Sequence, residues 1–325
     1  MYKRQVLAIA HNGNLSNGIM FPIVDSFSGK PVDRAYAEER IRWEPLYEAT
    51  QIKGDGEAHP FLSPNDEFAA YETWDQGNLD LSVIKTNDML QYEYARTALQ
   101  TGLQLKQKLG ANPYKFGMIG ATDSHTALAT AQEDNFFGKH SGAEPNAKRF
   151  EHPMAKVGDK EYTGWSMVAS GLAGVWAREN TREAIFDAMM RKETYATTGS
   201  RMLVRFFGGW DFNENDALSR LPADIGYVKG VPMGADLPKM PKGKKAPSFL
   251  VAALKDPLSG NLDRIQIVKG WVDGRGKRQE KIYEVVWGDA DKRKLNNKGK
   301  LPPVGNTVNV KTATWTNSIG APELI

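Results

Sequence analysis

An aspartate and a histidine stand two positions apart, directly after a short apolar run. The segment Gly-Ala-Thr-Asp-Ser-His occupies residues 120–125, and residues 115–119 before it are typical of a buried strand. At a strand end, Asp123 and His125 point to the same side, because side chains alternate along a strand. A carboxylate and an imidazole placed in this way can share a metal ion or a proton relay. The alternative is an aspartate that caps the next helix, beside a solvent-exposed histidine.

Two further strand ends carry polar side chains. Residues 6–10 are apolar and stop at His11, which opens a loop. Residues 46–51 predict another strand, and the charged loop that follows it contains His59. Barrel and α/β enzymes place their chemistry at the carboxyl ends of such strands. Three strand ends of this kind strengthen the hypothesis of a metal site.

Five segments of the chain resemble one protein family. They occur in the same order as in the family and span nearly the whole chain. The family is catalogued as domain of unknown function 3604, and is placed in the polymerase and histidinol phosphatase (PHP) superfamily of metal-dependent hydrolases. The resemblance does not supply the family's substrate. The matching segments are residues 11–18, 51–57, 120–125, 195–201 and 263–271.

The resemblance implies part of a metal site. PHP proteins hold two or three metal ions at the carboxyl end of a distorted (β/α)7 barrel. Late in the chain they use a strand-end histidine and then an Asp-x-His pair, which His11, Asp123 and His125 match. These three residues are therefore expected to be metal ligands. The His-x-His motif that PHP proteins use early in the chain is absent from this sequence.

The missing motif predicts that the chain is an internal fragment, truncated at both ends. The expected fold class is α/β, with the C-terminal half of a (β/α)7 barrel over residues 6–205 and a β-rich, sandwich-like domain over residues 206–325. Residues 1–5 resemble translated sequencing adapter, a common scar on assembled environmental (metagenomic) reads. The fragment is expected to bind metal weakly, with little or no turnover. The alternative is a naturally short protein that has lost half of the barrel.

The predicted chemistry is metal-assisted hydrolysis. A divalent ion lowers the pKa of bound water and polarises a phosphoryl, sulfuryl or acyl oxygen. Imidazole and carboxylate ligands suit Zn, Mn or Fe, and nothing in the sequence selects among them. The expected substrate is a small-molecule phosphoester, sulfate ester or related ester. Carbamate-cleaving relatives keep carboxyl-ester chemistry open.

Three residues of the loop after the second strand are candidate catalytic residues. Lys53 can hold an anionic leaving group or an oxyanion. Glu57 or His59 can support a ligand or donate a proton. For Lys53 the alternative is a surface salt bridge, and for His59 it is a capping role in the loop before Pro60.

Three other polar residues are candidate substrate-binding residues. Asn12 and Asn14 can orient a substrate, or they only shape the turn after the first strand. Arg201 can bind an anion, although a surface salt bridge is the favoured interpretation. Glu48 lies within a predicted strand as a candidate buried, paired carboxylate, and we do not expect it to be a ligand.

Composition excludes several classes of protein. The chain has 325 residues, 41% of them hydrophobic, and its net charge of +3 is too small to predict nucleic-acid binding. No run of 18 apolar residues occurs, so no transmembrane segment is expected in this fragment. The absence of cysteine excludes thiolate ligands and does not fix the compartment. A signal peptide would lie upstream, which leaves a periplasmic or exported location open.

Local patterns predict the elements before residue 205. Residues 88–109 and 181–192 have the apolar stripe of helices, and Asn180 or Thr181 is the expected cap of the second helix. Residues 133–166 are rich in glycine, proline and charge, and predict a long loop.

After residue 205 the predicted elements are strands. No helix is expected there, and the basic cluster 292–294 is interpreted as solvated surface. The alternative function belongs to this part, as a non-catalytic carbohydrate- or surface-binding β protein with Trp271, Trp287 and Trp315 as a stacking platform. The predicted strands are residues 249–254, 262–269, 281–287 and 307–315.

Overall fold

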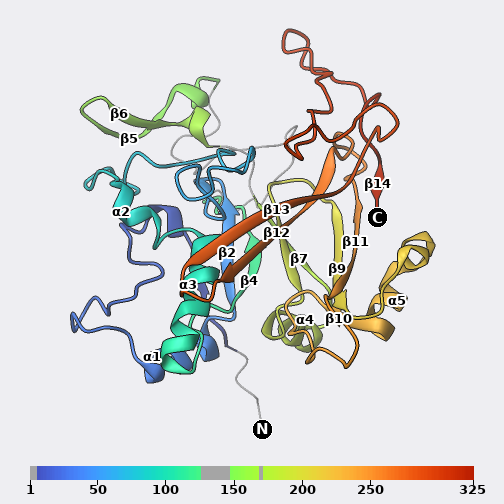
Figure 1. Ribbon diagram of the computed structural model, residues 1–325. Coiled ribbons are helices and arrows are strands. Elements are labelled where there is room, and N and C mark those ends of the chain that lie inside the picture. Colours follow the sequence, from blue (N-terminus) through green and yellow to red (C-terminus); the bar gives the residue numbers. More distant parts are fainter. Residues whose placement is uncertain (1–5, 126–146, 168–170) are drawn as a thin grey trace. The chain divides into compact units, whose positions relative to one another are not determined.

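The computed structural model describes residues 6–125, 147–167 and 171–325 (Figure 1). These residues form two compact units, each with its own β-sheet. We describe each unit by itself. The first unit comprises Met1–Gly199 and Gly270–Glu280, and the second comprises Ser200–Lys269 and Lys281–Ile325.

Three parallel strands form the centre of the first unit. Strand β2 (Leu46–Gln51) is fully buried and pairs in parallel with β1 (Ile9–Ala10) and with β4 (Gly117–Gly120). Strand β3 (Gly54–Asp55) turns back and pairs antiparallel with the end of β2. The three predicted strands are therefore confirmed as parallel neighbours, although β1 is shorter than expected. Their carboxyl ends lie at one edge of the sheet.

Two helices carry the chain back between the parallel strands. Helix α1 (Arg34–Trp43) connects β1 to β2, and its cap Asp33 accepts a hydrogen bond from the backbone N–H of Tyr36 at 2.8 Å. Helix α3 (Ala95–Leu109) precedes β4 and ends at Gly110, whose φ of 76° is left-handed. Parallel strands require such crossover connections.

The helix predicted over residues 88–109 is interrupted. A short helix α2 (Asn87–Leu90) ends before Glu93, whose buried carboxylate forms an ion pair that fixes a turn before α3 begins. On α3, Leu105 is buried, whereas Leu103 is 37% exposed. Tertiary contacts therefore override the local helical pattern.

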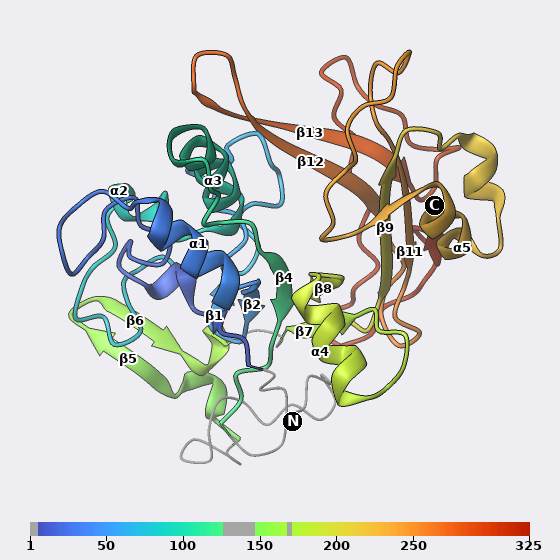
Figure 2. The ribbon, with the colours of Figure 1, turned by 90° about the horizontal axis from the view of Figure 1, so that it is seen from below.

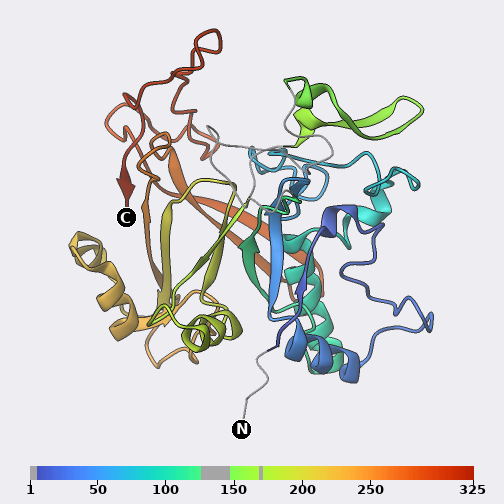
Figure 3. The same cartoon turned by 180° about the vertical axis from the view of Figure 1, so that it is seen from behind.

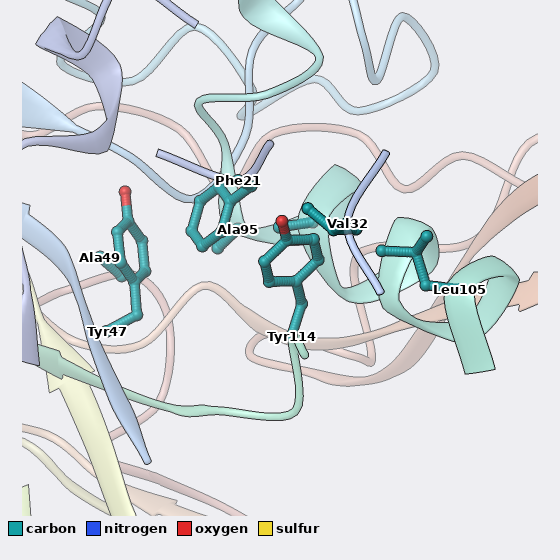
Figure 4. Close-up of a cluster of buried hydrophobic side chains, with 8 residues drawn as sticks. Phe21, Val32, Tyr47, Ala49, Ala95, Leu105 and Tyr114 are labelled. Atoms are coloured by element: carbon teal, nitrogen blue, oxygen red, sulfur yellow. The ribbon is translucent and has the colours of Figure 1, made fainter. Parts of the chain in front are cut away.

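The core of the first unit lies between β2 and α3. Phe21 packs edge-on against Tyr47 and Tyr114, with ring centroids 5.1 and 5.4 Å apart. Figure 4 shows Phe21 between these two rings, with Ala95 and Leu105 of α3 on the same cluster. This apolar cluster supports the strands behind the polar edge, because burial of large aromatic side chains contributes much of a core's stability.

A two-stranded hairpin replaces part of the predicted loop. Strands β5 (Pro153–Val157) and β6 (Lys160–Thr163) pair antiparallel and appear as the light green ribbon in Figure 2. Tyr162 stacks on Trp74 with ring centroids 4.2 Å apart. The predicted loop over residues 133–166 is therefore wrong where the structure describes it. The first part of that segment lies outside the described residues.

The second predicted helix is confirmed as α4 (Arg182–Met190). Thr181 caps it and accepts a hydrogen bond from the backbone N–H of Ala184 at 3.3 Å. Strands β7 (Leu172–Val175) and β8 (Thr194–Thr197) flank this helix in sequence and pair antiparallel with each other. The family-like segment that begins at residue 195 therefore lies partly in an antiparallel pair of strands.

The predicted fold class is wrong. The described residues contain several small sheets and no closed barrel. The parallel β/α pattern stops after β4, because β8 pairs antiparallel with β7 and does not continue the parallel series.

No described helix has the length and apolar character that crossing a membrane requires. Short 3₁₀ helices lie at η1 (Gly13–Leu15), η3 (Arg149–Glu151), η4 (Gly164–Ser166) and η5 (Glu214–Leu218).

The second unit is built on an antiparallel sheet in the order β10-β9-β11-β14. The long strands β9 (Leu203–Gly209) and β11 (Ser248–Leu254) lie side by side (Figure 3). Strands β10 (Gly230–Pro232) and β14 (Glu323–Leu324) pair at the two sides. The expectation of no helix in this part is wrong, since α5 (Pro222–Lys229) begins with a proline at its first position.

Between β11 and β14, the chain forms a long two-stranded ribbon. Strands β12 (Arg264–Val272) and β13 (Arg278–Trp287) match two predicted strands and appear in orange in Figure 1. Their turn is closed by a hydrogen bond from Asp273 N–H to the carbonyl of Lys277 at 2.9 Å. The strand predicted over residues 307–315 is wrong, because only an isolated bridge forms there.

The turn of the ribbon belongs to the first unit and contacts α3. Arg278 Nη1 donates to the hydroxyl of Thr101 at 2.9 Å, and Gln104 Nε2 donates to the carbonyl of Gly276 at 2.7 Å. Through these hydrogen bonds, the segment Gly270–Glu280 belongs to the first unit.

Candidate functional site

A buried ion pair joins two of the parallel strand ends. Lys53 follows β2 and Asp123 follows β4, and the Lys53 ammonium contacts Oδ2 of Asp123. The Lys53 side chain is only 2% exposed, whereas that of Asp123 is 21% exposed. A buried ammonium requires a carboxylate or other polar partners to offset its loss of hydration. The alternative of a surface salt bridge for Lys53 is therefore wrong, because its ion pair is buried, while its predicted catalytic role stays a prediction.

Glu48 lies beside this pair, on β2. Glu48 is 8% exposed, and burial raises the pKa of its carboxyl above the ordinary value. The Gln51 amide and the charges of His11 and Lys53 oppose this rise. His11, Lys53 and Glu48 therefore lie close enough to interact electrostatically at the carboxyl edge of the sheet. Groups with perturbed pKa values that gather at such an edge mark a candidate functional site.

The side-chain amide of Gln51 connects the ends of β1 and β2. Its Nε2 donates to Oδ1 of Asn12 at 2.5 Å and to Oε2 of Glu48 at 3.2 Å. Its Oε1 accepts from the backbone N–H of Lys53 at 3.0 Å. Asn12, a predicted substrate-binding residue, is thus engaged in holding the turn after His11.

Asp123 and His125 lie in the segment that leaves β4. Asp123 has a left-handed backbone with φ of 47°, which is uncommon for a residue other than glycine. Its carbonyl lies 3.0 Å from Nδ1 of His125, and the His125 side chain is exposed. This contact joins the Asp123 backbone, and not its carboxylate, to the imidazole, so a common direction of the two side chains stays a prediction.

The three predicted metal ligands fit a divalent ion in the chemistry of their donor atoms, but the structure does not show them arranged around one. His11, Asp123 and His125 offer two imidazoles and a carboxylate, the donors that Zn, Mn and Fe accept. Among the described residues, however, no group of three or more His, Asp or Glu side chains is arranged to hold a metal ion. Oδ2 of Asp123 contacts the positive charge of Lys53. The prediction of two or three bound ions stays a prediction.

Asn14, the second predicted substrate-binding residue, has a structural position. It is 2% exposed, and its Nδ2 donates to the carbonyl of Lys53 at 3.0 Å. Its own carbonyl accepts from Nζ of Lys85 at 2.8 Å, and Lys85 is also paired with Glu93. These contacts favour the alternative role, in which Asn14 shapes the turn.

The predicted proton donors Glu57 and His59 make contacts in the loop after β3. Glu57 pairs with Arg96 at 2.8 Å. His59 Nε2 lies 3.3 Å from Oδ2 of Asp75, and its Nδ1 accepts from the backbone N–H of Phe61 at 3.1 Å. Because both ring nitrogens of His59 have protein partners, the contacts favour the capping role in the loop.

Arg201, the third predicted substrate-binding residue, belongs to the second unit. Its backbone N–H donates to Oδ2 of Asp256 at 2.6 Å, and this bond lowers the pKa of the Asp256 carboxyl. All the other candidate site residues belong to the first unit. Arg201 and the other candidate site residues thus belong to different units.

The three tryptophans of the alternative hypothesis have different surroundings. Trp271 belongs to the first unit, and Trp287 and Trp315 belong to the second. Trp287 donates its indole N–H to the carbonyl of Arg293 at 3.1 Å, and Trp315 is 49% exposed. A stacking platform made of these three rings stays a prediction.

Asp55 is a second buried carboxyl close to the edge. Burial raises its pKa to about 8, and the charge of Glu57 adds to this effect. The backbone N–H groups of Glu57 and Ala58 donate to it at 2.8 and 3.3 Å and oppose the rise. A carboxyl with a higher pKa in the folded state binds its proton more tightly there. The stability that it contributes is therefore complete below pH about 4 and is lost as the pH rises towards 8.

The first prediction follows from this shift. Between pH 5 and pH 8, we expect Asp55 to lower the free energy of unfolding by about 3–4 kcal/mol, and Asp55→Asn to remove this part of the pH dependence. Urea unfolding of both proteins at the two pH values measures the effect. Asp80→Asn is the matched control, because Asp80 is exposed and its pKa is lowered by its bonds to Ser82. An unchanged pH dependence in Asp55→Asn would show that another group is responsible.

Sequence reasoning did not assign a site role to two residues at the edge. Glu48 was not expected to be a ligand, and Gln51 was not considered by itself. A signal for both exists, since a glutamate and a glutamine stand in a short strand that is buried throughout. Polar side chains at fully buried positions need partners, and here they find them at the neighbouring strand end.

The chain belongs to a known family. The family described as Protein of unknown function (DUF3604) matches residues 2–325. The predicted family is therefore confirmed. No curated protein and no solved structure matches the chain significantly.

Proposed function

We propose that the chain is a metal-dependent hydrolase of the PHP type, which cleaves ester bonds of small molecules at the carboxyl edge of β1, β2 and β4. One observation carries the proposal. Three neighbouring parallel strands bring four polar residues to that edge: His11, Glu48, Lys53 and Asp123. The family resemblance to PHP proteins supports the same edge. Parallel α/β sheets use this edge for binding and catalysis.

The proposal gives each residue a role. His11, Asp123 and His125 would hold the ion, and a divalent ion in that place supplies an activated water and polarises the ester oxygen. Lys53 brings a positive charge to the edge, where a buried ammonium stabilises developing negative charge on a phosphate, sulfate or carboxylate ester. Glu48 offsets part of that charge in the absence of substrate.

The second prediction tests this function. We expect slow hydrolysis of at least one substrate among aryl phosphate, aryl sulfate and aryl carboxylate esters when Mn or Zn is added. A chelator is expected to abolish it. Asp123→Asn should reduce the rate at least tenfold, because a ligand is lost while the shape of the side chain is kept. The rate of product release, followed by absorbance at high protein concentration, is the measurement.

Glu38→Gln is the matched control for this assay. Glu38 forms an exposed ion pair with Arg34 on α1, outside the candidate site, so the rate should stay unchanged. Hydrolysis that survives both the chelator and Asp123→Asn would place the activity elsewhere. Absence of hydrolysis for every ester, with no metal bound, would favour the non-catalytic alternative.

A further inference from the structure

The second unit carries an exposed finger, which we define as residues 305–318. It lies between β13 and β14 and belongs to the red loops of Figure 1. Every residue from 308 to 318 is exposed to solvent. The backbone N–H of Asn309 donates to the carbonyl of Thr314 at 2.7 Å, and the N–H of Thr314 donates to the carbonyl of Asn309 at 3.3 Å. The finger is therefore a narrow excursion of two arms, whose tip is the turn at residues 310–313.

The finger exposes large apolar side chains. Val310 is 87% exposed, Val308 is 58% exposed and Trp315 is 49% exposed. Val308 and Trp315 are the chain neighbours of the bridged pair and so stand opposite each other on the two arms, and Val310 begins the tip. Apolar side chains gain free energy when they leave water, and tryptophan is favoured where water meets the headgroups of a lipid bilayer.

Polar groups of the finger are hydrogen bonded within the finger. Oδ1 of Asn309 accepts from the backbone N–H groups of Lys311 at 3.1 Å and Thr312 at 3.3 Å. The hydroxyls of Thr312 and Thr314 are hydrogen bonded to each other at 2.7 Å. Polar groups that already have partners lose less free energy when water is withdrawn from them. The tip is therefore suited to enter a less polar environment in its folded form.

The segment that contains the finger has only basic charged residues. No aspartate or glutamate occurs between Asp291 and Glu323. Arg293 is buried, and Lys292 contacts Asp289 at 3.3 Å. Lysines near an anionic lipid surface strengthen binding to it. The exposed basic residues of the segment are Lys292, Lys294, Lys298, Lys300 and Lys311.

The base of the finger and the basic loop that precedes it are held together. Arg293 Nη2 donates to the carbonyl of Pro302 at 2.6 Å and to Oδ1 of Asp263 at 2.6 Å. The backbone N–H of Gly320 donates to Oδ2 of Asp289 at 2.7 Å. Both ends of the finger are thus tied to the loop that carries most of these lysines.

We propose that the finger docks the protein on an anionic lipid surface, with Val308, Val310 and Trp315 in contact with the lipid and the lysines close to the headgroups. The inference is independent of the proposed function. A lipid fits this tip better than a carbohydrate, because a sugar ring stacks on an aromatic face and bonds to free polar groups. Here the most exposed apolar side chain is the aliphatic Val310, and the polar groups of Asn309, Thr312 and Thr314 are bonded within the finger.

Sedimentation of the full chain with lipid vesicles tests the proposal. We expect binding to vesicles of equal parts phosphatidylcholine and phosphatidylglycerol to be about tenfold tighter than binding to phosphatidylcholine alone, and to weaken in about 0.5 M NaCl. Val310→Asp should weaken binding to the mixed vesicles at least about fivefold, because it places a carboxylate at the tip. Val310 is exposed, so this change should not disturb folding.

Val228→Asp is the matched control. Val228 lies on α5 of the same unit and is 86% exposed, so residue type, exposure and change of charge are the same as at Val310. Its binding to the mixed vesicles should stay within about twofold of the unaltered chain. An equal loss of binding in Val310→Asp and Val228→Asp would show that the finger is not the point of contact.

A fluorescent label shows whether the tip itself meets the lipid. The chain contains no cysteine, so Val310→Cys offers a single attachment point for an environment-sensitive fluorophore such as NBD. Its emission should shift to shorter wavelength when mixed vesicles are added, and the same label on Val228→Cys should not respond. An unchanged emission at position 310, or no binding of the unaltered chain to mixed vesicles, would overturn the proposal. Binding to an insoluble polysaccharide in place of vesicles would overturn it in favour of a carbohydrate ligand.

Discussion

Glu93→Ala is expected to lower the free energy of unfolding by about 3–5 kcal/mol. The Glu93 side chain is fully buried, and both of its oxygens accept from Nζ of Lys85 at 2.7 Å. It also accepts from the backbone N–H of Gly18 at 2.9 Å. Its removal leaves a buried ammonium without its carboxylate, since Lys85 is only 5% exposed. Urea unfolding, followed by tryptophan fluorescence, measures the loss.

Two further variants show whether the buried charge causes this loss. In the double variant Lys85→Met and Glu93→Leu, both charges are replaced by apolar side chains, and the loss should be much smaller. Glu38→Ala removes an exposed ion pair and should cost less than about 1 kcal/mol. A loss in Glu93→Ala no greater than in Glu38→Ala would contradict the buried ion pair.

Asp123→Ala is expected to destabilise the protein by about 3 kcal/mol, in addition to the loss of metal binding that the proposed function predicts. The reason is again a buried ammonium, since this change removes a carboxylate that contacts the Lys53 side chain. The double variant Lys53→Met and Asp123→Ala removes the charge as well and should recover part of the loss. The midpoint of urea unfolding of the three proteins gives the comparison. No recovery in the double variant would show that the cost of Asp123→Ala does not come from Lys53.

The strand ends could be predicted because their signal is local. Apolar runs that stop at His11 and before Asp123 indicate buried strands, and the structure confirms those strands as parallel neighbours of β2. The beginning of α4 at the cap Thr181 and the end of α3 at Gly110 also follow local signals, because a helix cap depends on the type of a single residue.

That the described residues form no closed barrel could not be predicted from the same signals. A strand pattern gives no direction of pairing, and β8 pairs antiparallel with β7 where the barrel hypothesis needs a parallel strand. Nor could the pattern of charged residues predict which of them are buried. Arg293 was interpreted as solvated surface, yet it is 6% exposed and pairs with Asp263, a residue 30 positions away.

The buried polar network at the edge depends on contacts that are distant in sequence. Gln51 and Asn12 are 39 positions apart, and so are Lys53 and Asn14. No pattern within one strand or loop predicts such partners. The Lys53–Asp123 pair joins the ends of two strands whose neighbourhood becomes evident only after the sheet forms.

The central claim is that the carboxyl edge of β1, β2 and β4 binds a divalent ion. Calorimetric titration of the unaltered chain with Zn or Mn tests it most directly, beside His11→Ala and Asp123→Asn. The proposal predicts weak, saturable binding in the unaltered chain, with the affinity reduced at least tenfold in both variants. Binding of equal strength in all three proteins, or no saturable binding in any of them, would contradict the claim.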